Sequence, residues 1–99
     1  MKVKELVSCV NLEGIEMKYS YLMESKEYNN ETVYGIVAKR ESIENGIVVN
    51  SIEERVDIIS KKKDLVQNLL DLLYKNQVSP IHLIDIIGET VDNCVFEFN

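Results

Sequence analysis

Ile15-Glu16-Met17-Lys18-Tyr19-Ser20-Tyr21-Leu22-Met23 is the stretch of the sequence that decides the fold. Apolar and polar residues alternate along it, and Leu22 is the only exception. This alternation is typical of a β-strand with one buried face. We therefore expect Tyr19 and Tyr21 to face the core. If that face were left uncovered, it would be a binding surface rich in Tyr and Met.

Three further strands are predicted around this one, from patterns that alternate less regularly. They cover residues 3–10, 32–40 and 47–59. The last of them contains the charged run Glu53-Glu54-Arg55, where we expect a bulge or a bend.

Short connections join the predicted strands. Gly14 indicates a hairpin, and the polar residues 25–31 are predicted to form a loop. Asn45-Gly46 is the strongest turn signal, because both residues tolerate positive φ and suit a type I′ turn. These links leave no room for crossover helices, so the sheet is expected to be antiparallel.

The apolar period changes to that of a helix after Ser60, which we predict to be the N-cap of the first helix. A second helix is predicted to begin with Ser79 as its cap and Pro80 at the first helical position. The apolar face of the first helix comprises Leu65, Val66, Leu69, Leu70, Leu72 and Leu73. One core is expected to combine helical and sheet residues, namely Leu69, Leu73, Ile84 and Ile87 with Ile15, Met17, Tyr19 and Tyr21.

The resulting fold class is α+β, in the order β-β-β-β-α-α. We predict one domain over residues 1–99, with an antiparallel four-stranded sheet over 1–59 and a layer of two helices over 60–92. Residues 93–99 are predicted to form either a docked tail or a short strand, and a strand there would be the fifth of the sheet.

Three segments carry a resemblance to a known family. They are Tyr34-Gly35-Ile36, the run Val56-Asp57-Ile58-Ile59-Ser60 with the Leu-rich helix after it, and Val78-Ser79-Pro80-Ile81-His82-Leu83-Ile84-Asp85-Ile86-Ile87. Together they resemble a family of small uncharacterised clostridial (Firmicutes) proteins of unknown function. The resemblance implies a small intracellular protein of an anaerobic Gram-positive bacterium, with no assigned activity.

The composition narrows the class of partner. The chain has 11 Lys and Arg against 17 Asp and Glu, so its net charge is −6. Because binding to a phosphate backbone depends on positive charge, nucleic acid is not expected as a partner. No apolar run approaches the ~18 residues of a membrane span, and residues 1–5 do not resemble the start of a signal peptide. We therefore expect a cytoplasmic protein that does not bind membranes.

Two cysteines, Cys9 and Cys94, lie far apart in the sequence without a CxxC spacing. This spacing does not suit a structural zinc site. We predict that both are small buried hydrophobic residues in a reducing compartment, with a disulfide or a reactive thiol as the alternative.

His82, Asp85 and Glu89 are spaced to share one face of the second helix. Such a set suits a divalent metal or acid–base chemistry, whereas the structural alternative is that His82 caps the helix. We expect no bound cofactor and keep the three residues as weak metal candidates. No local nucleophile–base pair and no Gly-rich phosphate loop occurs in the sequence, so we expect no enzymatic activity.

Charge is concentrated in two places. Residues 76–99 contain Asp85, Glu89, Asp92 and Glu97 but no Lys or Arg, which predicts an acidic face that is either solvated or a docking site. Lys61, Lys62 and Lys63 lie at the predicted start of the first helix. There they are expected to bind an anion or to be offset by Glu53 and Glu54.

These observations favour a non-enzymatic interaction or regulatory module that docks a protein partner. Asp85, Glu89 and Asp92 of the acidic face and Lys61, Lys62 and Lys63 are the predicted interaction residues. The alternative is a metal- or small-ligand-binding domain that uses His82, Asp85 and Glu89. A homodimer is also expected, because proteins seldom leave a β-rich edge such as residues 47–52 uncovered.

Overall fold

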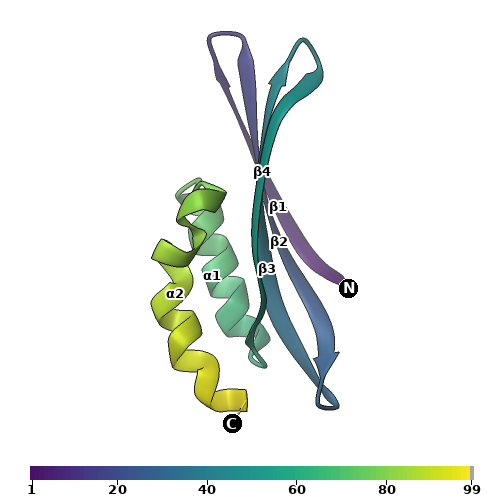
Figure 1. Ribbon diagram of the computed structural model, residues 1–99, viewed down its shortest axis with the longest axis vertical. Helices are drawn as coiled ribbons and strands as arrows, with labels where there is room; N and C mark the ends of the chain where they lie inside the picture. The colour runs from purple at the N-terminus through teal and green to yellow at the C-terminus, as the bar shows by residue number, and fades with distance from the viewer. Residues whose placement is uncertain (99) are drawn as a thin grey trace.

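The protein consists of one antiparallel sheet with two helices on one of its faces, as a computed structural model that describes residues 1–98 shows (Figure 1). The strands follow the sheet order β1-β2-β3-β4 and comprise β1 Lys2–Leu12, β2 Ile15–Tyr28, β3 Glu31–Glu44 and β4 Ile47–Ser60. The helical elements are α1 Lys63–Lys75, η1 Pro80–His82, α2 Leu83–Cys94 and η2 Val95–Phe98. The predicted α+β class, with four strands followed by two helices, is confirmed.

Two-residue turns connect successive strands. Glu13-Gly14, Asn29-Asn30 and Asn45-Gly46 all adopt positive φ, from 50° to 85°. The predicted turns at Gly14 and Asn45-Gly46 are confirmed, whereas the predicted loop over residues 25–31 is wrong. β2 continues to Tyr28, because Asn29 and Asn30 both tolerate positive φ and reverse the chain within two residues.

The irregularities of β4 do not lie where the sequence predicts them. Residues 53–55 pair regularly with β3, so the bulge predicted at Glu53-Glu54-Arg55 is wrong. The register shifts instead between Tyr34 and Ile36, and again between Ser42 and Ile43. At the first shift, a Cβ on Gly35 would lie 2.2 Å from the carbonyl oxygen of Asp57, so only glycine fits there.

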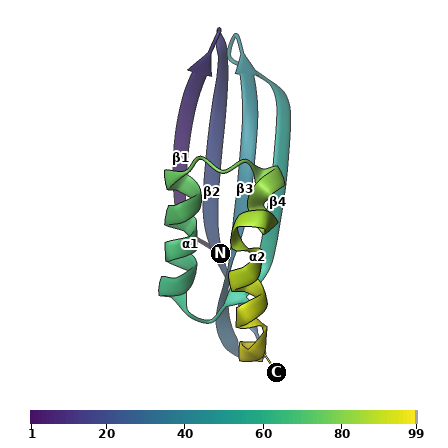
Figure 2. The same ribbon diagram turned by 90° about the vertical axis from the view of Figure 1, so that its left-hand side faces the viewer.

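The helices cover one end of the sheet and leave the other end bare (Figure 2). Both the β1–β2 turn and the β3–β4 turn lie at the uncovered end, which we call the turn end. Since β2, β3 and β4 have 14 residues each and α1 has 13, the strands extend over ~46 Å and α1 over only ~20 Å. A single layer of such helices is too short to cover the sheet.

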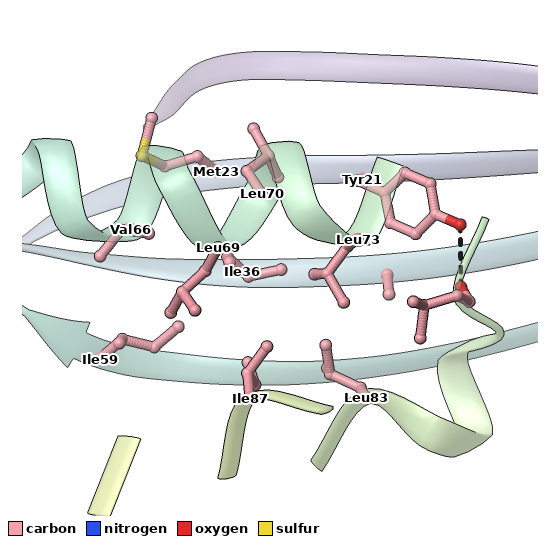
Figure 3. Packing of buried hydrophobic residues seen from close by; sticks show 12 residues of the cluster. Tyr21, Met23, Ile36, Ile59, Val66, Leu69, Leu70, Leu73, Leu83 and Ile87 are labelled. Carbon is pink, nitrogen blue, oxygen red and sulfur yellow. Dashed lines mark hydrogen bonds between the residues drawn. The ribbon is translucent and has the colours of Figure 1, made fainter. Parts of the chain in front are cut away.

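The core lies between the helices and the covered end of the sheet (Figure 3). Its buried residues are Tyr21, Met23, Ile36, Ala38, Ile59, Val66, Leu69, Leu70, Leu73, Val78, Leu83 and Ile87. The prediction is therefore confirmed for Tyr21, Leu69, Leu73 and Ile87. It is wrong for Ile84, which is 58% exposed, and for Ile15 and Met17, which are only half-buried and do not belong to the core cluster. Tyr19 is also half-buried and contacts the core only from its border.

The helix boundaries differ from the predicted ones. Ser60 is not the N-cap of α1, because it ends β4 and the N-cap position is Lys62. Pro80 does begin a helical segment after Ser79, but this is the 3-10 turn η1, and α2 starts at Leu83. The layer of two helices extends to Cys94 rather than residue 92.

The predicted fifth strand is wrong, because Val95–Phe98 forms the 3-10 helix η2. This segment is docked instead: the Phe98 ring packs edge-on against Tyr28, with ring centroids 5.9 Å apart. The last residue of the predicted tail, 99, lies outside the described residues.

The two cysteines lie in different environments. Cys94 is buried, as predicted, but Cys9 is exposed. Cys9 pairs with Lys18 on the face of the sheet that points away from the helices, so the prediction for Cys9 is wrong. No helix among residues 1–98 is both long enough and apolar enough to cross a membrane.

Truncation to alanine should lower the free energy of unfolding more at Leu73 than at Ile84. Leu73→Ala removes a fully buried side chain and is expected to lower the free energy of unfolding by ~2–5 kcal/mol. Ile84→Ala removes an exposed side chain and is expected to cost less than ~1 kcal/mol. Urea denaturation followed by circular dichroism measures both, and an equal loss in the two variants would contradict this core.

Candidate interaction surface

The candidate site is the helix-side face of the sheet at the turn end. Strand register places four residues in each cross-strand row. The rows are Ser8, Tyr19, Arg40 and Ile52, then Val10, Met17, Ser42 and Asn50, then Leu12, Ile15, Glu44 and Ile47. We call these twelve residues the turn-end face.

Aliphatic and aromatic side chains dominate the turn-end face. Leu12 and Ile47 are 61% and 66% exposed, and Ile15, Met17 and Tyr19 are half-buried. A second protein that packed on this face would remove the apolar area from water. Seven of the twelve residues of the turn-end face are apolar, and polar or charged side chains lie between them.

Two side-chain contacts fix the orientation of the central residues. The Ser42 hydroxyl lies 3.4 Å from the Met17 sulfur, so both side chains are on the same side of the sheet, which is the side of the buried Tyr21 on β2. Arg40 Nη1 lies 3.4 Å from Ser79 Oγ, next to η1. Arg40 therefore stands at the border between the turn-end face and the helices.

Tyr21 marks the place where helical cover ends. Its buried hydroxyl donates a 2.8 Å hydrogen bond to the carbonyl oxygen of Val78, in the connection between α1 and η1 (Figure 3). Burial raises the pKa of Tyr21, so the phenol stays protonated and remains a donor. The sheet is thus joined to the helical layer one row before the turn-end face begins.

The opposite face of the sheet has a different character. It holds a shallow depression of ≈ 230 Å³ lined by Glu5, Lys18, Ser20, Leu22, Val37, Lys39, Glu41 and Glu53. Its volume is below the ~300–1,000 Å³ of pockets for small molecules. Because charges of both signs line the depression, this face is typical of solvated surface.

The predicted set His82, Asp85 and Glu89 is only partly brought together. His82 Nδ1 lies 3.4 Å from Asp85 Oδ2, and both side chains are more than half exposed. Among residues 1–98, no group of three His, Cys, Asp or Glu side chains is placed to hold a metal ion. The geometry therefore gives the metal alternative no support.

The acidic residues of α2 lie on its solvent side. Asp85, Glu89 and Asp92 are all exposed and follow one another at helical spacing. The buried side of the same helix is formed by Leu83, Ile87 and Cys94. The predicted acidic face thus holds for Asp85, Glu89 and Asp92 but not for Glu97, which bonds to Ser60 and Lys61, and whether the face docks a partner stays a prediction.

The lysines at the start of α1 are not offset by Glu53 and Glu54. Lys61 instead pairs with Glu31 at 2.6 Å and lies 5.6 Å from the centre of the Phe98 ring. Lys62 and Lys63 are exposed. Lys61 therefore helps to hold η2 and β3 against each other, which is a structural contact.

Glu97 completes this cluster at the end of β4. It accepts hydrogen bonds from the Lys61 N–H, at 2.9 Å, and from the Ser60 hydroxyl, at 2.7 Å. Burial alone would raise the pKa of Glu97, but these hydrogen bonds outweigh it, and the pKa lies below the usual 4.5. The carboxylate thus satisfies the backbone between β4 and α1.

A comparison with protein families shows to which family the chain belongs. A family model described as a family of unknown function (DUF6514) matches residues 1–93, which include all four strands and α1. The chain belongs to the DUF6514 family. The comparisons with curated proteins and with solved structures find no match. The sequence thus assigns the chain to DUF6514. Because the function of this family is unknown, the function of the chain is inferred from its surface.

Membership of DUF6514 confirms one part of the resemblance. The predicted relationship to a family of unknown function is correct, and it extends further towards the N-terminus than residue 34. The clostridial origin implied by the resemblance stays a prediction.

The sequence predicts a binding surface on the apolar side of residues 15–23 only if that side is uncovered, and it favours burial in the core instead. The signal was present, because the alternation that predicts the strand continues from Met23 back to Ile15 over a greater length than one helix covers. A comparison of strand and helix lengths would have predicted an uncovered end.

Loss of the Glu97 charge should change how stability depends on pH. Because the folded state favours the carboxylate, its stabilising effect is full above the unfolded pKa of 4.5 and is lost as the pH falls through the lower folded pKa. Glu97→Gln is therefore expected to lower stability by about 1 kcal/mol at pH 7 and to converge on the wild type in acid.

Urea denaturation between pH 7 and pH 3 measures this difference. Glu89→Gln is the matched control, because it removes the same charge from an exposed position of α2. A constant difference between Glu97→Gln and the wild type at every pH would contradict the assignment.

Proposed function

We propose that this DUF6514 protein is a non-enzymatic protein-interaction module, and that the turn-end face is the surface with which it binds. The observation that carries the proposal is the continuity of the apolar side of β2. Tyr21 and Met23 are fully buried under the helices, and Tyr19, Met17 and Ile15 continue the same side beyond them. The alternating pattern thus continues from fully buried residues to residues that the helical layer covers only at its border.

The chemistry of the turn-end face favours a protein as the partner. Its aliphatic residues together with Tyr19 and Met17 match the composition of protein interfaces. Arg40 is the only basic residue of the turn-end face, and the net charge of the chain is −6. The face therefore attracts a phosphate backbone only weakly. The exposed side of α2 carries Asp85, Glu89 and Asp92, and it also exposes Ile84 and Ile86.

Site-specific photo-cross-linking in the source organism tests the proposal. A benzophenone amino acid replaces Tyr19 in the turn-end face, Glu89 on the acidic side of α2, or Ser20 on the opposite side of β2. We expect a discrete protein adduct from position 19, which mass spectrometry identifies, and none from position 20. The Tyr19 replacement is conservative because one aromatic side chain substitutes for another.

The remaining outcomes separate the alternatives. An adduct from position 89 without one from position 19 would move the interaction to the acidic side of α2. The absence of adducts from all positions would refute the interaction module.

A further inference from the structure

We infer that the partner of the turn-end face is a second copy of this chain, packed face to face across a two-fold axis. The inference rests on the proposed function and names its partner. Two copies would bury the same residues against each other, as an isologous interface requires. The turn ends of the two sheets would then form a β-sandwich, with one helical layer at each end.

The position of the helices leaves one direction for the axis. An axis parallel to the strands would place the helices of both copies in the same space. An axis that runs across the strands, between the two sheets, places the helices of the two copies at opposite ends of the dimer. Sheets pack ~10 Å apart, which is the thickness of one helical layer, so the second sheet lies beside α1 and α2 rather than on top of them.

The strand register makes the turn-end face complementary to itself about such an axis. If the axis passes through the row of Met17 and Ser42, this row meets the same row of the second copy. The row of Tyr19 then meets the row of Ile15. Tyr19 faces Ile15 of the partner subunit and Ile52 faces Ile47 of the partner subunit, so aromatic and aliphatic side chains cover one another.

Charge complementarity supports the same arrangement. Arg40 and Glu44 are the charged residues of the turn-end face, and they lie on β3 at equal distances from Ser42. The axis places Arg40 opposite Glu44 of the partner subunit, and symmetry forms this pair twice. Each charge therefore meets its opposite, and no like charges face each other.

The alternative dimer, by edge pairing of β4, is less well supported. Residues 47–52 are uncharged, but the register shift between Ser42 and Ile43 disturbs β4 in this segment. Bulges of this kind twist an edge away from regular pairing. Edge pairing would also leave the turn-end face uncovered.

Sedimentation velocity over about 1–500 µM protein tests the inference. The wild type is expected to form a dimer, and Met17→Lys, at the centre of the interface, is expected to be a monomer. Ser20→Lys is the matched control, because it adds a lysine to the opposite side of the same strand and should leave the dimer intact.

Charge reversal at the exposed Glu44 identifies this interface among all possible dimers. Glu44→Arg and Arg40→Glu are each expected to weaken dimerisation about tenfold, and the double variant is expected to recover most of the loss. Circular dichroism of each variant confirms that its fold is intact.

Three results would overturn the dimer: a wild type that stays monomeric throughout, a Met17→Lys variant that still dimerises, or a double variant without recovery. A monomer whose position 19 cross-links to a different protein would refute the homodimer and leave the interaction module standing.

Discussion

The mismatch in length between strand and helix is the constraint on which the rest of the structure depends. A strand advances ~3.3 Å per residue and a helix 1.5 Å, so elements of similar residue number cover very different distances. With 14 residues in β3 and 13 in α1, one end of the sheet has no helix over it. The molecule therefore has a covered end that holds the core and a bare end on which apolar side chains lie among polar ones.

The covered end is held by contacts that do not depend on the turn end. Leu70, Leu73 and Ile87 are fully buried against the sheet, and the Tyr21 hydroxyl binds the connection between the helices. At the other side of this core, Glu97 joins η2 to the start of α1. Both anchors lie outside the turn-end face, which contacts the helical layer only through its border row, for example by the contact of Arg40 with Ser79.

The sequence predicts the parts of this fold that depend on local chemistry. Asn45-Gly46 specifies its turn by backbone preference, and the period of α1 identifies Leu69 and Leu73 as buried. Ile84 could not be predicted in the same way, because the position of the sheet decides which apolar side of α2 is buried. Met17 has the same local pattern as Met23, and only the placement of the helices distinguishes the half-buried residue from the fully buried one.

The sheet order β1-β2-β3-β4 has a consequence for the time course of folding. Every strand pairs with its neighbour in the sequence across a two-residue turn, so each hairpin closes a short loop and can form in microseconds. Contacts between α1 and β2 span much longer stretches of chain and carry a greater entropy of closure. The paired strands are thus expected to precede the docked helices, and both faces of the sheet are then exposed to other newly made chains.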